Sequence, residues 1–182
     1  MKYVIATLLM LACSSVNAGM VKTAVPSSTG LRLMWWPKVS PPNGWHFDQG
    51  SSYYFSFNAM APNGSTFSKA ETVMYARADY KPRLPDIKTL QAFISNDMAS
   101  FKQDEPTIVM VHEQPLRTKR GQSFQIALYH PAHGSSGNWE RVAYGEDGEY
   151  YLTFVVSSRS NQGLKAAMPA FMSLLSSYQP GP

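Results

Sequence analysis

The feature that most constrains the fold of this sequence is a predicted hairpin that runs directly into an amphipathic helix. Two alternating apolar runs, 139–144 and 149–157, flank the segment 145–148 (Gly-Glu-Asp-Gly), and Asp-Gly between such runs is a strong hairpin signature. Apolar residues at three- and four-residue spacing follow from about Asn161, with Ser160 as the predicted N-cap. Because the apolar stripe of this helix needs a surface to cover, the sequence predicts a helix packed on an antiparallel sheet.

The remaining elements are predicted from periodicity and turn residues. A second amphipathic helix is expected from Asp86, its predicted N-cap, to about Lys102. Pro169 interrupts the carboxyl-terminal helix, where an interior proline costs about 3 kcal/mol, so we expect a kink or two consecutive short helices. Together with the strands, these helices predict an α+β fold with an antiparallel sheet. Extended segments are predicted at 31–36, 45–47, 53–60, 72–79, 107–113 and 122–130.

The composition is that of a globular protein and predicts a single domain. The chain has 182 residues, of which 13% are aromatic and 15% are charged. We expect one domain at residues 31–182, preceded by a flexible leader at 19–30, where the residues are small and polar. The 16 Lys and Arg residues exceed the 12 Asp and Glu residues by a net charge of +4, which is too small and too scattered to predict nucleic-acid binding.

The amino-terminal residues carry the pattern of an export signal. A positively charged start precedes the almost wholly apolar residues 3–12, and the small residues at 16–18 (Val-Asn-Ala) suit a signal peptidase. We therefore expect residues 1–18 to be removed as a signal peptide and the protein to be periplasmic or secreted. The alternative is lipidation of Cys13, because 10–13 (Met-Leu-Ala-Cys) loosely resembles a lipobox. Only this alternative would anchor the protein to a membrane.

Two stretches of the sequence resemble the PsbP-like superfamily. The turn at 42–45 (Pro-Asn-Gly-Trp) resembles the turn that follows the first strand of these proteins. The strand at 149–157 and the helix through 168–171 (Met-Pro-Ala-Phe) resemble the last strand and helix of the bacterial, exported DcrB-type members. In element order the likeness spans residues 31–178. It implies an α/β/α sandwich around an antiparallel sheet, and mostly non-catalytic roles in binding, assembly or chaperoning of other proteins.

The sequence contains no recognised catalytic motif, so we expect neither catalysis nor a cofactor. The serine-containing turns at 50–52 and 134–137 do not match the nucleophile elbow of hydrolases. The His112-Glu113 pair lacks the second histidine of a zinc-protease helix, and there is no phosphate-binding loop or dinucleotide-binding glycine pattern.

Three histidines form the one candidate metal site. If the turn at 119–121 joins its two strands symmetrically, His112 lies diagonal to His130 on one face, and His133 follows three residues later. Zinc needs three or four ligands in a tetrahedral array, so the count is barely sufficient for a metal-dependent hydrolase. The interpretation that we favour is that these histidines border a buried apolar face.

Aromatic residues supply the candidate binding surface. Trp35 and Trp36 are neighbours on a predicted strand, so one indole can meet a ligand unless helices cover both faces of the sheet. Trp45 and Tyr54 are further candidates for exposed aromatic residues. We therefore expect a non-catalytic exported protein that acts on another protein of the bacterial cell envelope as a binding, assembly or chaperone-like factor. A small-molecule or glycan binder that uses these aromatic residues is the alternative.

Overall fold

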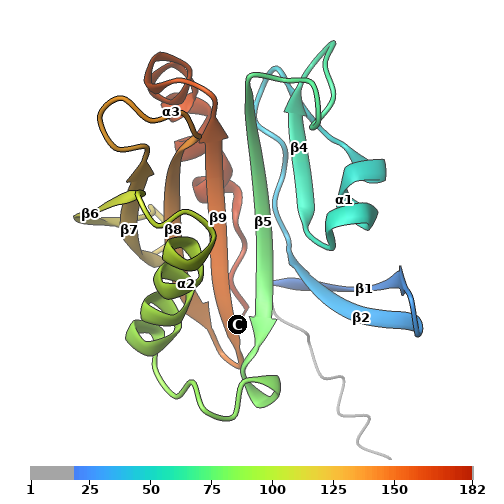
Figure 1. Ribbon diagram of the computed structural model, residues 1–182. Coiled ribbons are helices and arrows are strands. Elements are labelled where there is room, and N and C mark those ends of the chain that lie inside the picture. The colour runs from blue at the N-terminus through green and yellow to red at the C-terminus, as the bar shows by residue number, and fades with distance from the viewer. Residues whose placement is uncertain (1–18, 182) are drawn as a thin grey trace, which may run out of the picture.

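The computed structural model describes residues 19–181, so the predicted signal segment and Cys13 lie outside the described residues. Within this range, strands and helices follow one another along the whole chain (Figure 1). The strands are β1 (Met20–Ser27), β2 (Gly30–Pro37), β3 (Trp45–Phe47), β4 (Asn58–Pro62), β5 (Thr72–Tyr80), β6 (Val109–Arg117), β7 (Ser123–His130), β8 (Trp139–Asp147) and β9 (Tyr150–Ser158). The helices are α1 (Gln49–Phe55), α2 (Leu90–Asp104) and α3 (Asn161–Ser177), with a 3-10 turn at Lys81–Arg83.

These strands form one antiparallel sheet that divides at one edge. The main order is β1-β2-β5-β9-β8-β7-β6, which places the last strand, β9, at the centre. On the side away from β9, β5 pairs with two strands. β4 pairs with its first half (Asn58 opposite Ala76), and β2 pairs near its end (Trp35 opposite Ala78). The sheet therefore has two arms beyond β5: the β1–β2 hairpin, and β4 with β3 and α1 (Figure 1).

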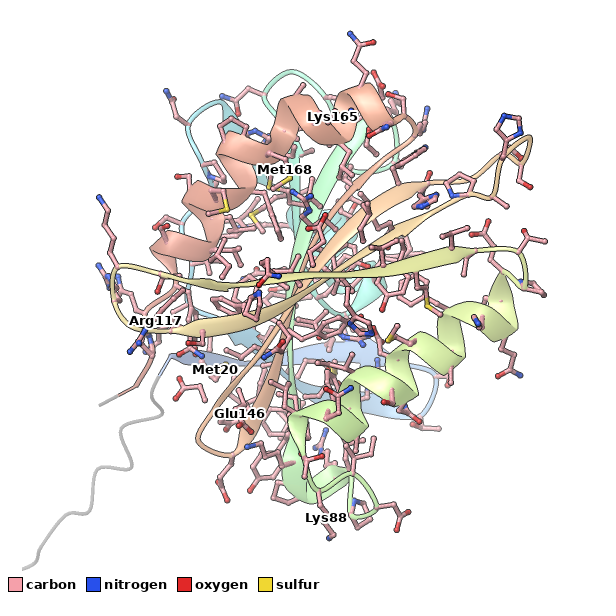
Figure 2. The ribbon with its side chains drawn as sticks, turned by 90° about the vertical axis from the view of Figure 1, so that its left-hand side faces the viewer. Met20, Lys88, Arg117, Glu146, Lys165 and Met168 are labelled. Carbon is pink, nitrogen blue, oxygen red and sulfur yellow. The ribbon has the colours of Figure 1, made fainter. Side chains whose placement is uncertain are left out.

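Helices α2 and α3 pack on opposite faces of the sheet, and Figure 2 shows the sheet between them. Alternate residues of the central strands point to the two faces, so each face has its own buried cluster. This arrangement confirms the predicted α+β fold class. Within residues 19–181, no helix is long and apolar enough to span a membrane. The cluster under α3 includes Met74, Phe124, Phe154, Leu164, Phe171 and Leu174, and that under α2 includes Phe93, Ile94, Tyr129, Val142, Tyr144 and Val155.

The carboxyl-terminal hairpin and helix form as predicted. β8 and β9 pair in continuous register up to Asp147 and Tyr150. The side chain of Ser160 caps α3 by accepting a hydrogen bond from the backbone N–H of Gly163 at 3.0 Å. The helix continues through Pro169 as one element, so the alternative of two short helices is wrong. We attribute this continuity to burial of the apolar stripe, which outweighs the hydrogen bond that the proline removes.

The expected flexible leader at 19–30 is wrong, because this segment forms β1. β1 pairs with β2 along all eight of its residues, from Met20 opposite Pro37 to Ser27 opposite Gly30. Its side chains at Met20 and Val25 are 2% and 0% exposed, respectively. Complete pairing with a neighbouring strand and these two buried side chains order a segment whose composition alone suggested a linker.

The strand predicted at 53–60 is also wrong in its first half. Residues up to Phe55 belong to α1, and extended structure begins only at Asn58. The helix is capped by Asp48, whose side chain accepts a hydrogen bond from the backbone N–H of Ser51, and it ends at Ser56 with a left-handed φ of 63°. Cap and turn together override the alternating aromatic pattern that suggested a strand.

Helix α2 begins later than predicted. Its N-cap is Thr89, whose side chain accepts a hydrogen bond from the backbone N–H of Ala92, so Asp86 is not the cap. Residues 85–86 form a turn and 87–88 have no regular structure, so the helix begins only after Thr89 supplies the cap.

Candidate binding groove

Helix α2 covers only part of its face of the sheet, and α1 lies beyond the part that it leaves uncovered (Figure 1). A groove lies on this part, between α2 and α1, where the end of α1 and three strands line it. The groove contains a cavity of about 330 Å³. It crosses the start of β5, the end of β9 and the start of β8, so residues distant in the sequence line it together. Its lining includes the aromatic residues Phe55, Phe57, Phe67 and Tyr75 and the polar residues Glu71, Glu140, Ser157 and Arg159.

A row of aromatic rings forms one wall of the groove. It begins at the exposed Tyr54, whose ring meets that of Phe55 edge-on, with 4.8 Å between the ring centroids. Phe55 stacks on Phe57 at 5.5 Å, and Phe57 stacks on Tyr75 of β5 at 4.4 Å. Phe67, from the loop between β4 and β5, flanks Phe57 at 5.6 Å. The row leads from the protein surface to the sheet, and its rings give the groove an apolar wall.

Asp48 holds the two segments of this wall together. Its Oδ1 accepts a hydrogen bond from the backbone N–H of Ser51 at 3.0 Å, and its Oδ2 accepts one from the backbone N–H of Phe67 at 2.8 Å. These hydrogen bonds lower the pKa of the Asp48 carboxyl, and the one from Phe67 has the larger effect. One ionised side chain therefore fixes both α1 and the loop that carries Phe67.

Glu140 supplies a carboxyl to the lining of the groove. Ser157, directly across from it on β9, donates its hydroxyl hydrogen to Oε1 of Glu140 at 2.7 Å. The second oxygen, Oε2, is buried and has no hydrogen-bond partner among the described residues. Burial raises the pKa of Glu140, the Ser157 hydroxyl opposes this increase, and the carboxylates of Asp97 and Glu105 add to it. The groove is thus lined by a carboxyl with one oxygen that no group of the described chain satisfies.

A polar network continues from the groove beneath α2. Arg77 of β5 pairs with Asp97 of α2 at 3.1 Å and with Asp79 at 3.3 Å. The Tyr144 hydroxyl donates to Oδ2 of Asp97 at 2.6 Å and lies 2.7 Å from the hydroxyl of Tyr129. Burial, followed by the charge of Asp97, raises the pKa of Tyr144 far above its ordinary value, and burial raises the pKa of Tyr129 to about 12. These contacts fix α2 on the sheet, where Asp97, Phe101 and Asp104 line a second cavity that shares Tyr75 with the groove.

The two adjacent tryptophans do not form an exposed pair. Trp35 is only 9% exposed, stacks on Tyr80 at 5.0 Å between ring centroids and lies 4.4 Å below the guanidinium of Arg83. It belongs to the buried cluster under α3, so its indole is not the exposed one of the pair. Trp36 points to the other face and is half-buried, and its Nε1 lies 3.4 Å from the carbonyl oxygen of Ser56, to which it donates.

The other two aromatic candidates are also separated in space. Trp45 is half-buried and packs against the cluster under α3. Tyr54 is 82% exposed on α1 and begins the aromatic row of the groove. Of the four aromatic candidates, Tyr54 is therefore the one that the structure connects to the groove.

The histidines do not share a face, because the register of β6 and β7 differs from the symmetric one that we assumed. His112 lies opposite Ala127 and His130 lies opposite Val109, with a bulge at 113–116. A shift of one residue turns every side chain of a strand to the other face. His112 is consequently on the α2 face, whereas His130 is on the α3 face, as are Phe124 and Ile126 of the same strand.

The surroundings of the histidines are those of ordinary surface residues. His130 stacks on Trp139 with 4.8 Å between ring centroids, and His112 and His133 are exposed. Within the part of the chain that the structure describes, no group of three or more His, Cys, Asp and Glu side chains is arranged to hold a metal ion.

The residues that line the groove were not singled out from the sequence. Phe57 and Tyr75 appeared as strand residues without a binding role, and Phe67 and Ser157 carried no signal. Glu140 did have a signal in the sequence. It lies two and four residues before Val142 and Tyr144 on a predicted strand, so its carboxyl must share their apolar face.

No family model matches this sequence, and no curated protein matches it. Solved structures are similar in fold. The crystal structure of PA94 from Pseudomonas aeruginosa, a protein of unknown function, has a TM-score of 0.50 at 11% identity, with 88% of this chain and 98% of that chain covered. The solution structure of PsbP (CyanoP) from Synechocystis has a TM-score of 0.47 at 12% identity, with 94% of this chain and 98% of that chain covered. The crystal structure of the Ran-binding protein Mog1p from Saccharomyces cerevisiae has a TM-score of 0.43 at 9% identity, with 86% of this chain and 89% of that chain covered. The likeness to PA94 extends to the fold alone.

Proposed function

We propose that this chain is a non-catalytic binding protein of the bacterial cell envelope that holds a segment of another envelope protein in the groove between α1 and α2. Its main support is that one cavity combines a row of aromatic rings with a buried carboxyl oxygen that has no partner within the described chain. Binding sites are typically concave and largely apolar, with a few polar groups that orient the ligand. The groove is concave, and six of its twelve lining residues are aromatic or aliphatic while the other six are polar or charged.

Exposed aromatic residues beside the groove favour a protein partner. Tyr53, Tyr54 and Phe55 are 47%, 82% and 46% exposed on α1, although such side chains are usually buried. Tyrosine is enriched among the residues that contribute most to protein–protein binding. A partner that enters the groove would also cover these rings, which gives the exposed face of α1 a role.

The location in the envelope and the family placement rest on the sequence. Residues 1–18 carry the pattern of an export signal. The turn at 42–45 is closed by a hydrogen bond from the backbone N–H of Trp45 to the carbonyl of Pro42 at 3.0 Å, and Gly44 adopts the φ of +82° that favours glycine. This turn supports our proposal that the chain is a distant, DcrB-type member of the PsbP-like superfamily.

A small-molecule or glycan ligand is the second candidate, and the size of the cavity favours it. A volume of about 330 Å³ is near the lower end of the range of small-molecule sites, roughly 300–1,000 Å³. Native mass spectrometry of protein purified from its own host tests this alternative, because a bound small molecule adds a discrete mass that denaturation removes.

Site-specific photo-crosslinking in the native host tests the main proposal. A photoreactive phenylalanine analogue at Phe55 or Phe67 should yield one and the same protein adduct, because both positions border the groove. The control position is Lys165, which is exposed on α3 on the opposite face of the sheet (Figure 2) and should yield no such adduct. Absence of an adduct at both groove positions, or the same adduct at all three positions, would contradict the proposed site.

A further inference from the structure

We propose that the groove selects a basic side chain, the guanidinium of arginine or the ammonium of lysine, which the bound segment places against Glu140. This selectivity rests on the proposed function and names the chemistry of what is bound. It is supported by three features of the groove: an acceptor without a partner in the described chain, an excess of carboxylates, and aromatic rings in the same lining.

The carboxyl of Glu140 is half satisfied by the protein. Ser157 donates to Oε1 at 2.7 Å, whereas the buried Oε2 receives no hydrogen bond from the described residues. A buried charged acceptor without a donor is unfavourable, and a positively charged donor satisfies it better than a neutral one. A guanidinium or ammonium group would supply both the hydrogen bond and the opposite charge.

The charges around the groove also favour a cation. Arg77 is already paired with Asp79 and Asp97, and Nη2 of Arg159 donates to the carbonyl of Ser68 at 3.3 Å. The surplus is therefore negative, although the whole chain has a net charge of +4. Such local complementarity steers partners and fixes which one binds. The charged residues that line the groove and the adjoining cavity are Glu71, Glu140, Asp97 and Asp104, against Arg77 and Arg159.

The aromatic wall suits the rest of a basic side chain. Arginine and lysine lay their aliphatic stems along apolar surfaces while the charged end reaches a polar group. Phe57 is itself stacked between Phe55 and Tyr75, so this wall offers the stem apolar contact and does not present a free face of Phe57 to the cation.

A matched pair of small probes tests the selectivity. Benzamidine carries an aromatic ring and a cationic amidinium, and benzamide has nearly the same shape without the charge. In NMR titrations of the mature protein at pH 8, benzamidine should bind at least about tenfold more tightly than benzamide, as expected for a charge-assisted hydrogen bond. The shifted resonances should be those of the groove, such as Phe67 and Ser157.

Glu140→Gln is the decisive variant. Glutamine keeps the shape and can still accept the hydrogen bond from Ser157, so we expect the variant to fold, which its circular dichroism spectrum checks. The preference for benzamidine should disappear in this variant. A preference of the same size in the variant, or equal binding of the two probes by the unaltered protein, would overturn the inference.

A second pair of probes separates this inference from the proposed function. An apolar peptide with one arginine should bind in the groove more tightly than the same peptide with neutral citrulline. Equal binding of both peptides would overturn the selectivity for a cation but leave a peptide-binding groove. Binding of benzamidine without binding of either peptide would leave the cation site but overturn the protein partner, and no binding of any probe would overturn both.

Discussion

Replacement of Phe171 by alanine tests whether α3 belongs to the core of the fold. Phe171 is 1% exposed and shares the buried cluster under α3 with Leu152 and Phe154 of β9. Loss of a fully buried phenylalanine removes its burial energy and leaves a cavity, so we expect a destabilisation of about 3–5 kcal/mol. Because a whole domain is stable by only about 5–15 kcal/mol, this one change removes a large part of the margin.

Equilibrium unfolding in urea measures this effect. With a slope of about 2 kcal/mol per molar urea, the midpoint should fall by about 1.5–2.5 M. The control is Lys165→Ala, on the exposed side of the same helix, which should change stability by less than about 0.5 kcal/mol. If Phe171→Ala does not fold, Phe171→Leu should still lower the midpoint. Equal midpoints for the Phe171 variants and the Lys165 control would refute the packing of α3 on the sheet.

Three further predictions concern packing, charge and processing. Gly163→Ala should destabilise the protein by about 1–3 kcal/mol, measured as a lower Tm than that of the exposed control Gln162→Ala, because an added Cβ would collide with side chains of β5 and β9. Burial raises the pKa of Glu140, so its ionisation lowers the stability of the fold as pH rises through that pKa. In urea unfolding, Glu140→Gln should be as stable as the unaltered protein near pH 4 and more stable at pH 8. The opposite trend would contradict the burial of this carboxyl. The intact mass of protein from its native host should correspond to a chain that begins at Gly19, whereas a diacylated chain that begins at the cysteine would show lipidation instead.

The parts of the fold that follow from the sequence are those whose signals are local. The β8–β9 hairpin was predicted from the segment 145–148, and α3 from its apolar spacing and from Ser160 as its cap. The strand predicted at 72–79 matches β5 within one residue. In each case neighbouring residues determine the structure, so no distant contact was needed.

The elements that differ from prediction depend on contacts that neither composition nor periodicity shows. α1 is fixed by Asp48, whose second oxygen reaches the backbone of Phe67, nineteen residues away. β1 is ordered by its pairing with β2, and its composition alone resembled that of a linker. The bulge at 113–116 moved His112 to the other face, which no local pattern indicated before the register was known.

The groove could not be predicted from the sequence for the same reason. Its walls come from the end of α1, from the loop at Phe67 and from three strands that are adjacent only in the folded sheet. Periodicity can show that Glu140 lies on an apolar face, but it cannot show that Ser157 satisfies only one of its oxygens. The aromatic row likewise needs the reversal of the chain at Ser56.

The most direct test of the binding groove is the titration of the Glu140 carboxyl by carbon-13 NMR, with its signal assigned from the spectrum of Glu140→Gln. In the free protein we expect a pKa above that of an exposed glutamate, because the carboxyl is buried. Saturation with benzamidine should lower this pKa, because a bound cation favours the charged form. An ordinary pKa that benzamidine leaves unchanged would contradict the account of this groove as the binding site.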